Sequence, residues 1–101
     1  MKPATKAIHP GFILRVRLKI LRVSISEAAR ALGICRTHFS DVVNGRAGIS
    51  ANIALRLSLS IGGSPEEWLS HQCDYDLQLA RERFLGISRQ VRKIGGRRDA
   101  E

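Results

Sequence analysis

Cysteine and proline are scarce in this sequence, and each shortage excludes a class of protein. Only two cysteines occur among 101 residues, Cys35 and Cys73, with no Cys-x-x-Cys pair and no Cys/His cluster. A disulfide framework or a zinc site needs more such residues at closer spacing, so we expect two reduced thiols, no metal and no other cofactor. With three prolines and 44% hydrophobic residues, the composition is that of a globular protein rather than a disordered one.

Long apolar runs are also lacking. Arg15, Arg17 and Lys19 interrupt the N-terminal apolar stretch, and no run approaches the roughly 18–20 residues that cross a bilayer. We therefore expect a cytoplasmic protein that makes no use of a membrane. The three histidines, two cysteines and scattered serines form no recognisable pair of nucleophile and base, and residues 71–74 (His-Gln-Cys-Asp) are too short a cluster for a metal site. An enzyme is not expected.

Acidic residues are few beside the basic ones: nine against 17, a net charge of +8. Residues 1–26 hold six basic residues and no acid, and residues 81–101 hold seven basic and three acidic residues. An imbalance of this size favours a polyanionic partner, above all a nucleic acid, over a charge that serves only solubility. Both ends are basic, while the middle is slightly acidic.

Helix signals follow one another along most of the chain. Pro10 opens a helix through Val23, and a capping box at residues 24–27 (Ser-Ile-Ser-Glu) starts a second helix that stops at Gly33. Apolar spacing predicts a third short helix up to Asn44-Gly45, a fourth over residues 51–61 after Ser50, and a fifth after the capping box at residues 64–67. We expect an all-α domain of five helices over residues 10–85, between a flexible arm (1–9) and a basic tail (86–101).

The second and third predicted helices form a helix-turn-helix pattern. Ala29 lies four residues before Gly33, where a small side chain lets the two helices approach closely. Phe39 and Val42 lie six and nine residues after Gly33, where apolar side chains pack the third helix against the second. In this geometry the second helix of the pair enters the major groove of DNA. Duplex DNA is therefore the expected partner.

Polar side chains crowd the outer edge of the third predicted helix. Arg36 is the best candidate to bind guanine O6 and N7, with a phosphate clamp as the alternative role. Asp41 either accepts from cytosine, orients Arg36 or faces water, and His38 either contacts the backbone or is simply solvated. The full set of expected DNA-binding residues is Arg36, Thr37, His38, Ser40, Asp41, Asn44 and Arg46. On the first helix, Arg15, Lys19 and Arg22 share a face that either extends this footprint or is solvated.

The fifth predicted helix carries two apolar stripes roughly 140° apart, at 100° per residue. Leu69, Cys73, Leu77, Ala80 and Phe84 form one stripe. Trp68, Tyr75 and Leu79 form the other, and we expect these three at a dimer interface. The alternative is that the chain's own first helix and tail bury both stripes.

In these motifs the sequence resembles the XRE-type helix-turn-helix proteins, and more narrowly the HigA/VapI-type addiction-module antidote (antitoxin) proteins. The resemblance covers about residues 9–81 and is carried by residues 9–11, 24–33, 44–45, 48–51, 54–57 and 64–69. It implies a five-helix, lambda-repressor-like fold, a homodimer, repression of its own palindromic operator and neutralisation of a RelE-like, mRNA-cleaving toxin. Departures are Ile25 in place of a polar residue, Cys35 in place of a Ser or Thr cap, a basic first helix, and Ser70-His71-Gln72 in place of Asn-Leu-Gln.

Three alternatives to an operator-binding antitoxin remain open from the sequence. The chain could act mainly as a protein inhibitor of a toxin, because Ile25 and Cys35 replace polar contacts. It could be a stand-alone regulator without a toxin. The basic ends also admit an RNA-binding module, but Trp68, Tyr75 and the phenylalanines fall on apolar stripes rather than on base-stacking platforms.

Overall fold

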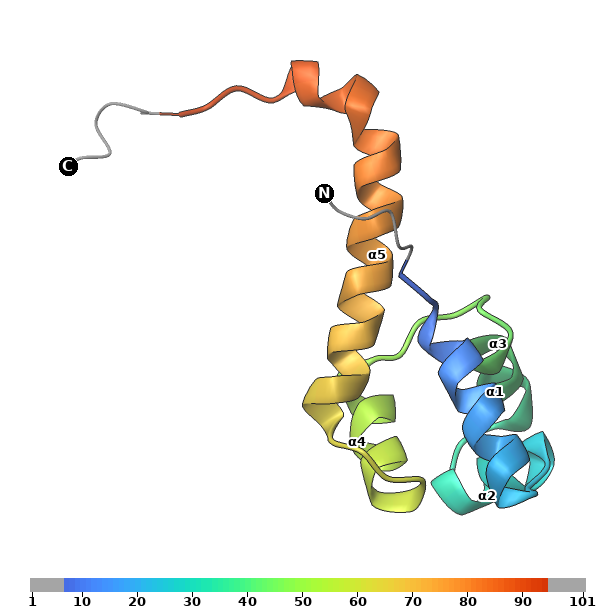
Figure 1. Cartoon of the computed structure of the whole chain (residues 1–101). Coiled ribbons are helices and arrows are strands. Elements are labelled where there is room, and N and C mark those ends of the chain that lie inside the picture. Colours follow the sequence, from blue (N-terminus) through green and yellow to red (C-terminus); the bar gives the residue numbers. More distant parts are fainter. Residues whose placement is uncertain (1–6, 95–101) are drawn as a thin grey trace.

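A computed structural model describes residues 7–94 of the chain, and every regular element within that range is a helix (Figure 1). The helices are α1 (Pro10–Leu21), α2 (Ile25–Leu32), α3 (Arg36–Val43), α4 (Ala51–Ser60), α5 (Pro65–Ile87) and a short 3-10 helix, η1 (Ser88–Gln90). The expected all-α, five-helix class is confirmed. Residues 1–6 of the expected arm and 95–101 of the expected tail lie outside the described residues.

The helix starts follow the predicted caps. In α2 the Ser24 hydroxyl accepts the Glu27 N–H at 3.0 Å and the Glu27 carboxylate accepts the Ser24 N–H at 2.9 Å. Ser64 and Glu67 form the same reciprocal pair at the start of α5, at 3.0 and 3.1 Å. Both capping boxes satisfy N–H groups that a helix start otherwise leaves unpaired.

Two helix ends differ from the prediction. Helix α1 stops at Leu21, two residues before Val23, because Arg22 adopts a left-handed conformation (φ 58°) and its N–H bonds back to the carbonyls of Leu18 and Lys19. Leu21, the last residue of the helix, is consequently 51% exposed. Helix α5 continues to Ile87, beyond the expected boundary at residue 85.

The core gathers apolar side chains from all five α-helices. Leu14 and Leu18 of α1 belong to it, and α1 packs on α3 and α5. The buried set is Leu14, Leu18, Ala28, Ala29, Leu32, Phe39, Val42, Val43, Ile49, Ile53, Ala54, Leu57 and Trp68. Helix α5 packs on α4 and α1, and its C-terminal half projects away from the other helices (Figure 1). No helix in the described part of the chain is long and apolar enough to cross a membrane.

Helices α1 and α3 approach each other closely at Gly11. A Cβ atom built on Gly11 would lie 2.7 Å from the Val43 carbonyl oxygen and closer still to the Val42 carbonyl oxygen. Only a residue without a side chain fits there, so Gly11 sets the spacing between the start of α1 and the end of α3.

Trp68 belongs to the chain's own core, which corrects one of the expected dimer contacts. Its side chain is 2% exposed, and its Nε1–H donates to the Gly62 carbonyl at 2.9 Å. The Arg17 guanidinium lies 5.6 Å from the centre of the indole ring, which explains a charged residue within the apolar arc of α1. Trp68 therefore has almost no surface to give a second subunit.

The two stripes of α5 differ in exposure, a division that the sequence left open. On the Trp68 stripe, Tyr75 is half-buried with its ring edge-on to the His9 imidazole, 4.8 Å between centroids. On the other stripe, Leu77 and Phe84 are each 43% exposed. Leu69, at the start of this stripe, packs against the core, so the stripe is open only farther along the helix.

Candidate nucleic-acid interface

Helices α2 and α3 form the predicted helix-turn-helix unit around Gly33. Gly33 is left-handed (φ 74°), and the Ile34 N–H reaches back to the Ala29 carbonyl at 3.0 Å. Ala29 is 2% exposed and Phe39 is fully buried, as the spacing required. The turn therefore fixes the angle at which α3 leaves α2.

Arg56 of α4 binds the outer side of this turn. Its Nη1 donates to the Leu32 carbonyl at 2.8 Å and to the Gly33 carbonyl at 3.2 Å, and its Nε donates to the Asn52 side chain at 2.7 Å. A cation at the carboxyl end of α2 satisfies carbonyls that lack a partner within the helix and complements the helix dipole. Sequence reasoning gave Arg56 no role, because the turn and this residue lie 23 or 24 positions apart.

Arg36 begins α3 and is exposed. Its Nε–H donates to the Ser26 hydroxyl of α2 at 2.7 Å. Neither of its terminal nitrogens has a hydrogen-bond partner within residues 7–94. The side chain is thus held at one atom and open at the two atoms that form bidentate contacts. Ser26 was not a predicted site residue, since a bond between adjacent helices leaves no local sequence signal.

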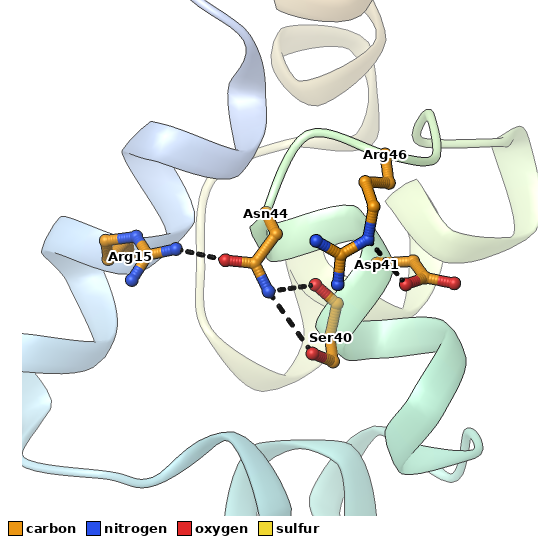
Figure 2. A network of polar contacts seen from close by, with 5 residues as sticks. All are labelled: Arg15, Ser40, Asp41, Asn44 and Arg46. Atoms are coloured by element: carbon orange, nitrogen blue, oxygen red, sulfur yellow. Dashed lines mark hydrogen bonds and ion pairs between the residues drawn. The ribbon is translucent and has the colours of Figure 1, made fainter.

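The carboxyl end of α3 carries a second polar cluster, drawn in Figure 2. The Asn44 amide nitrogen donates to the Ser40 carbonyl at 2.9 Å and to the Ser40 hydroxyl at 3.3 Å. The Asn44 oxygen accepts from Arg15 of α1. This bond joins the basic face of α1 to the end of α3.

Asp41 pairs with Arg46 rather than with Arg36. Its carboxylate lies 3.2 Å from the Arg46 Nε, and Figure 2 shows the two side chains facing each other. Because the Arg46 side chain is 64% exposed, the pair contributes little stability, about 0–1 kcal/mol. Its effect is to limit where the Arg46 guanidinium can lie.

The first turn of α3 has no side-chain cap. Cys35 occupies the cap position, and its thiol makes no capping hydrogen bond. The free N–H groups of His38 and Thr37 nevertheless lower the pKa of the Cys35 thiol, because they stabilise its thiolate. Thr37 and His38 are both exposed beside Arg36. The predicted residues therefore lie together on α3 and the turn after it, with Ser40 and Asp41 half-buried and the other five exposed.

Comparisons with known proteins agree with this geometry. No family model matches the chain. The chain is 43% identical over 75 residues to virulence-associated protein A′ of Dichelobacter nodosus, a match that covers 73% of this chain and 65% of that protein. An addiction-module antidote protein of a HigA family from Coxiella burnetii is 34% identical, with a TM-score of 0.80 and coverage of 88% of this chain and 99% of that one.

The chain belongs to the HigA family of antitoxins. A further solved relative, the Pseudomonas aeruginosa antitoxin HigA with the higBA promoter, is 32% identical, has a TM-score of 0.80, and covers 88% of this chain and 99% of its own. The chain's relatives include antitoxins and a helix-turn-helix transcriptional regulator, which are not enzymes. The resemblance found in the sequence motifs is thereby confirmed.

Within the HigA fold, one departure of this chain now has a structural explanation. Ile25, which replaces a polar residue at the start of α2, is half-buried and packs against the core cluster. Its side chain packs against the core and makes no polar contact. The polar residue that α2 does present to α3 is the next one, Ser26.

Proposed function

We propose that this HigA-family chain represses transcription by binding a palindromic operator in duplex DNA through α3. Two facts support the proposal. The solved HigA relative from P. aeruginosa was obtained with promoter DNA. In the present chain, the outer edge of α3 carries the polar side chains that such binding requires. A repressor of this kind would act in the cytoplasm, where its operator is.

The contact between Arg36 and Ser26 carries the proposal. Because the hydroxyl holds Nε at 2.7 Å, the two terminal nitrogens project together and lose little freedom on binding. A guanine in the major groove offers O6 and N7 to such a pair, and a bidentate contact discriminates against other bases by about 1–3 kcal/mol. Thr37, on the same turn, lies beside this contact.

The remaining α3 residues would position the protein on the duplex. His38, Asn44 and Arg46 are exposed. His38 and Arg46 can donate hydrogen bonds to phosphate oxygens, whereas Asn44, whose amide already donates twice to Ser40, would exchange one of those bonds for a phosphate. Ser40 and Asp41 orient Asn44 and Arg46, respectively. Phosphate contacts fix register without reading sequence, so we assign base reading mainly to Arg36 and Thr37.

We propose a homodimer formed through the open stripe of α5. Leu77 and Phe84 lie seven residues apart on the projecting half of the helix, each 43% exposed, with the exposed Cys73 on the same stripe. Burying such a stripe against its own copy removes apolar surface from water and gives a two-fold axis. Of the contacts expected earlier, Tyr75 and Leu79 are half-buried and lie on the opposite stripe of α5. A two-fold dimer would place its recognition helices about 34 Å apart.

We also propose that the chain neutralises a RelE-like toxin. Helix α1 has an exposed apolar face formed by Phe12, Val16 and Ile20, which are 55%, 42% and 72% exposed. Exposed apolar faces of this kind mark protein partners. Toxin inhibition with little DNA binding is the second candidate function, and it is favoured by the core-packed Ile25 and the uncapped start of α3.

Binding to the chain's own promoter tests the main proposal. Wild type should bind that duplex more tightly than a scrambled duplex of equal length, and Arg36→Ala should lose about 1–3 kcal/mol of this preference. Arg83→Ala, an equal charge change on α5, serves as the control. If Arg36→Ala keeps the full preference for the promoter, the assignment of base reading is wrong. Co-expression with the product of the adjacent reading frame tests the toxin: a stable complex without any operator preference would favour the second candidate.

A further inference from the structure

A groove opens between α1, the start of α2 and the end of α3. Its volume is about 460 Å³. Its lining includes Arg15, Lys19 and Arg22 along α1 and at its C-terminal end, Ser24 and Glu27 at the start of α2, Val43 at the end of α3, and three further apolar residues. The groove is therefore a separate surface from the edge of α3 that carries Arg36.

The charge of this groove is strongly positive. Its three cations are exposed, and none forms an ion pair with any residue between 7 and 94. The one carboxylate in the lining, Glu27, already accepts the Ser24 N–H at 2.9 Å as part of the capping box. Cations along a concave wall focus their field on an anion within it more strongly than they would on a convex face.

The groove is continuous with the proposed DNA surface. Arg15 lines the groove and also donates to Asn44, the residue at the end of α3 that we assign to the sugar-phosphate backbone (Figure 2). A phosphate strand that contacts Asn44 would reach Lys19 and Arg22 by continuing along α1. Asn44 and Arg15 thus link the two surfaces.

We propose that this groove binds the sugar-phosphate backbone of the operator beyond the major-groove segment that α3 reads. The inference rests on the proposed function and adds a second, sequence-independent contact to it. Lys19 and Arg22 each neutralise a phosphate, while Arg15 is held by Asn44 at the junction. The basic character of α1 then compensates for the phosphate contact that Ile25 does not supply.

The test is a salt titration of duplex binding by the full chain. Lys19→Gln combined with Arg22→Asn removes two charges from the groove, and Asn tolerates the left-handed backbone of Arg22. Arg81→Gln combined with Arg83→Gln removes two exposed charges from α5 as the matched control. Each lost phosphate contact reduces the magnitude of the negative slope of log K against log salt by about 0.9. For the groove variant we expect the magnitude of this slope to decrease by about two per protomer. Its operator affinity at 0.1 M salt should fall on the order of tenfold or more.

Hydroxyl-radical footprinting gives the position of the contact. Wild type should protect sugars outside the major-groove segment, and the groove variant should lose that protection alone. An unchanged slope and footprint, with Arg36→Ala still losing operator preference, would overturn the groove contact and leave the proposed function standing. An equal loss of slope in the α5 control would also overturn it, because the effect would then be one of net charge. If wild type binds no duplex, both proposals fail.

Discussion

Replacing Gly11 with alanine is the sharpest test of how α1 holds α3. The added Cβ would lie 2.7 Å from the Val43 carbonyl oxygen, whereas ordinary contacts begin at 3.4 Å, so the helices must separate by at least about 0.7 Å (3.4 minus 2.7). The neighbouring atoms are backbone oxygens, so no side-chain rotation can relieve the clash. The His9 ring nitrogen, 3.0 Å away, is crowded too.

The expected loss of stability follows from two opposing effects. Overpacking of this kind costs about 1–3 kcal/mol, and the absence of a flexible neighbour places Gly11→Ala at the upper end. Alanine is a better helix former than glycine by up to about 1 kcal/mol, which offsets part of the cost. The net loss is about 2 kcal/mol, or roughly 8–16 °C in the melting temperature of a domain of this size.

Thermal and urea unfolding of the full chain would measure this loss. Gly86→Ala is the matched control, because Gly86 also lies in a helix but its Cβ would meet nothing within 4 Å. The control should be as stable as wild type or slightly more so. A Gly11→Ala variant with wild-type stability would refute the idea that this backbone contact sets the spacing of α1 and α3.

Two further predictions concern the turn and the start of α1. Arg56→Met should lower the free energy of unfolding by about 1–2 kcal/mol in urea titrations, because it leaves two carbonyls at the end of α2 without their charged donor; unchanged stability would show that the turn holds without it. Burial lowers the pKa of His9, an effect partly offset by Asp76 and the Ala47 backbone, and its Nδ1 must be unprotonated to accept the Gly11 N–H at 2.8 Å. Below the ordinary pKa of about 6.5 the unfolded chain therefore binds a proton that the folded chain resists, so stability should fall as pH drops through the lowered value. His9→Asn keeps a capping oxygen without titrating and should flatten melting temperatures between about pH 7 and pH 5; parallel curves for the two proteins would contradict this role.

Local features of the fold could be predicted from the sequence because the interactions that produce them span only a few residues. The hydroxyls of Ser24 and Ser64 need only an N–H and a glutamate three positions later, so each pattern marks a helix start without reference to distant parts of the chain. Gly33 likewise ends α2 through its own freedom to adopt a positive φ. Caps, turns and apolar spacing together were enough to predict the helix-turn-helix unit and the surface of α3.

The pairing of helices was decided only by the tertiary structure. Periodicity shows that α5 has two apolar stripes, but both have similar composition, and only the packing of α4 and α1 determined that Trp68 faces the core and Leu77 faces solvent. The contacts of Arg17 with Trp68 and of Arg36 with Ser26 join residues from different helices, so no local pattern reveals them. A sequence specifies which faces of a helix are apolar or charged, whereas the partner of each face depends on how all the helices pack at once.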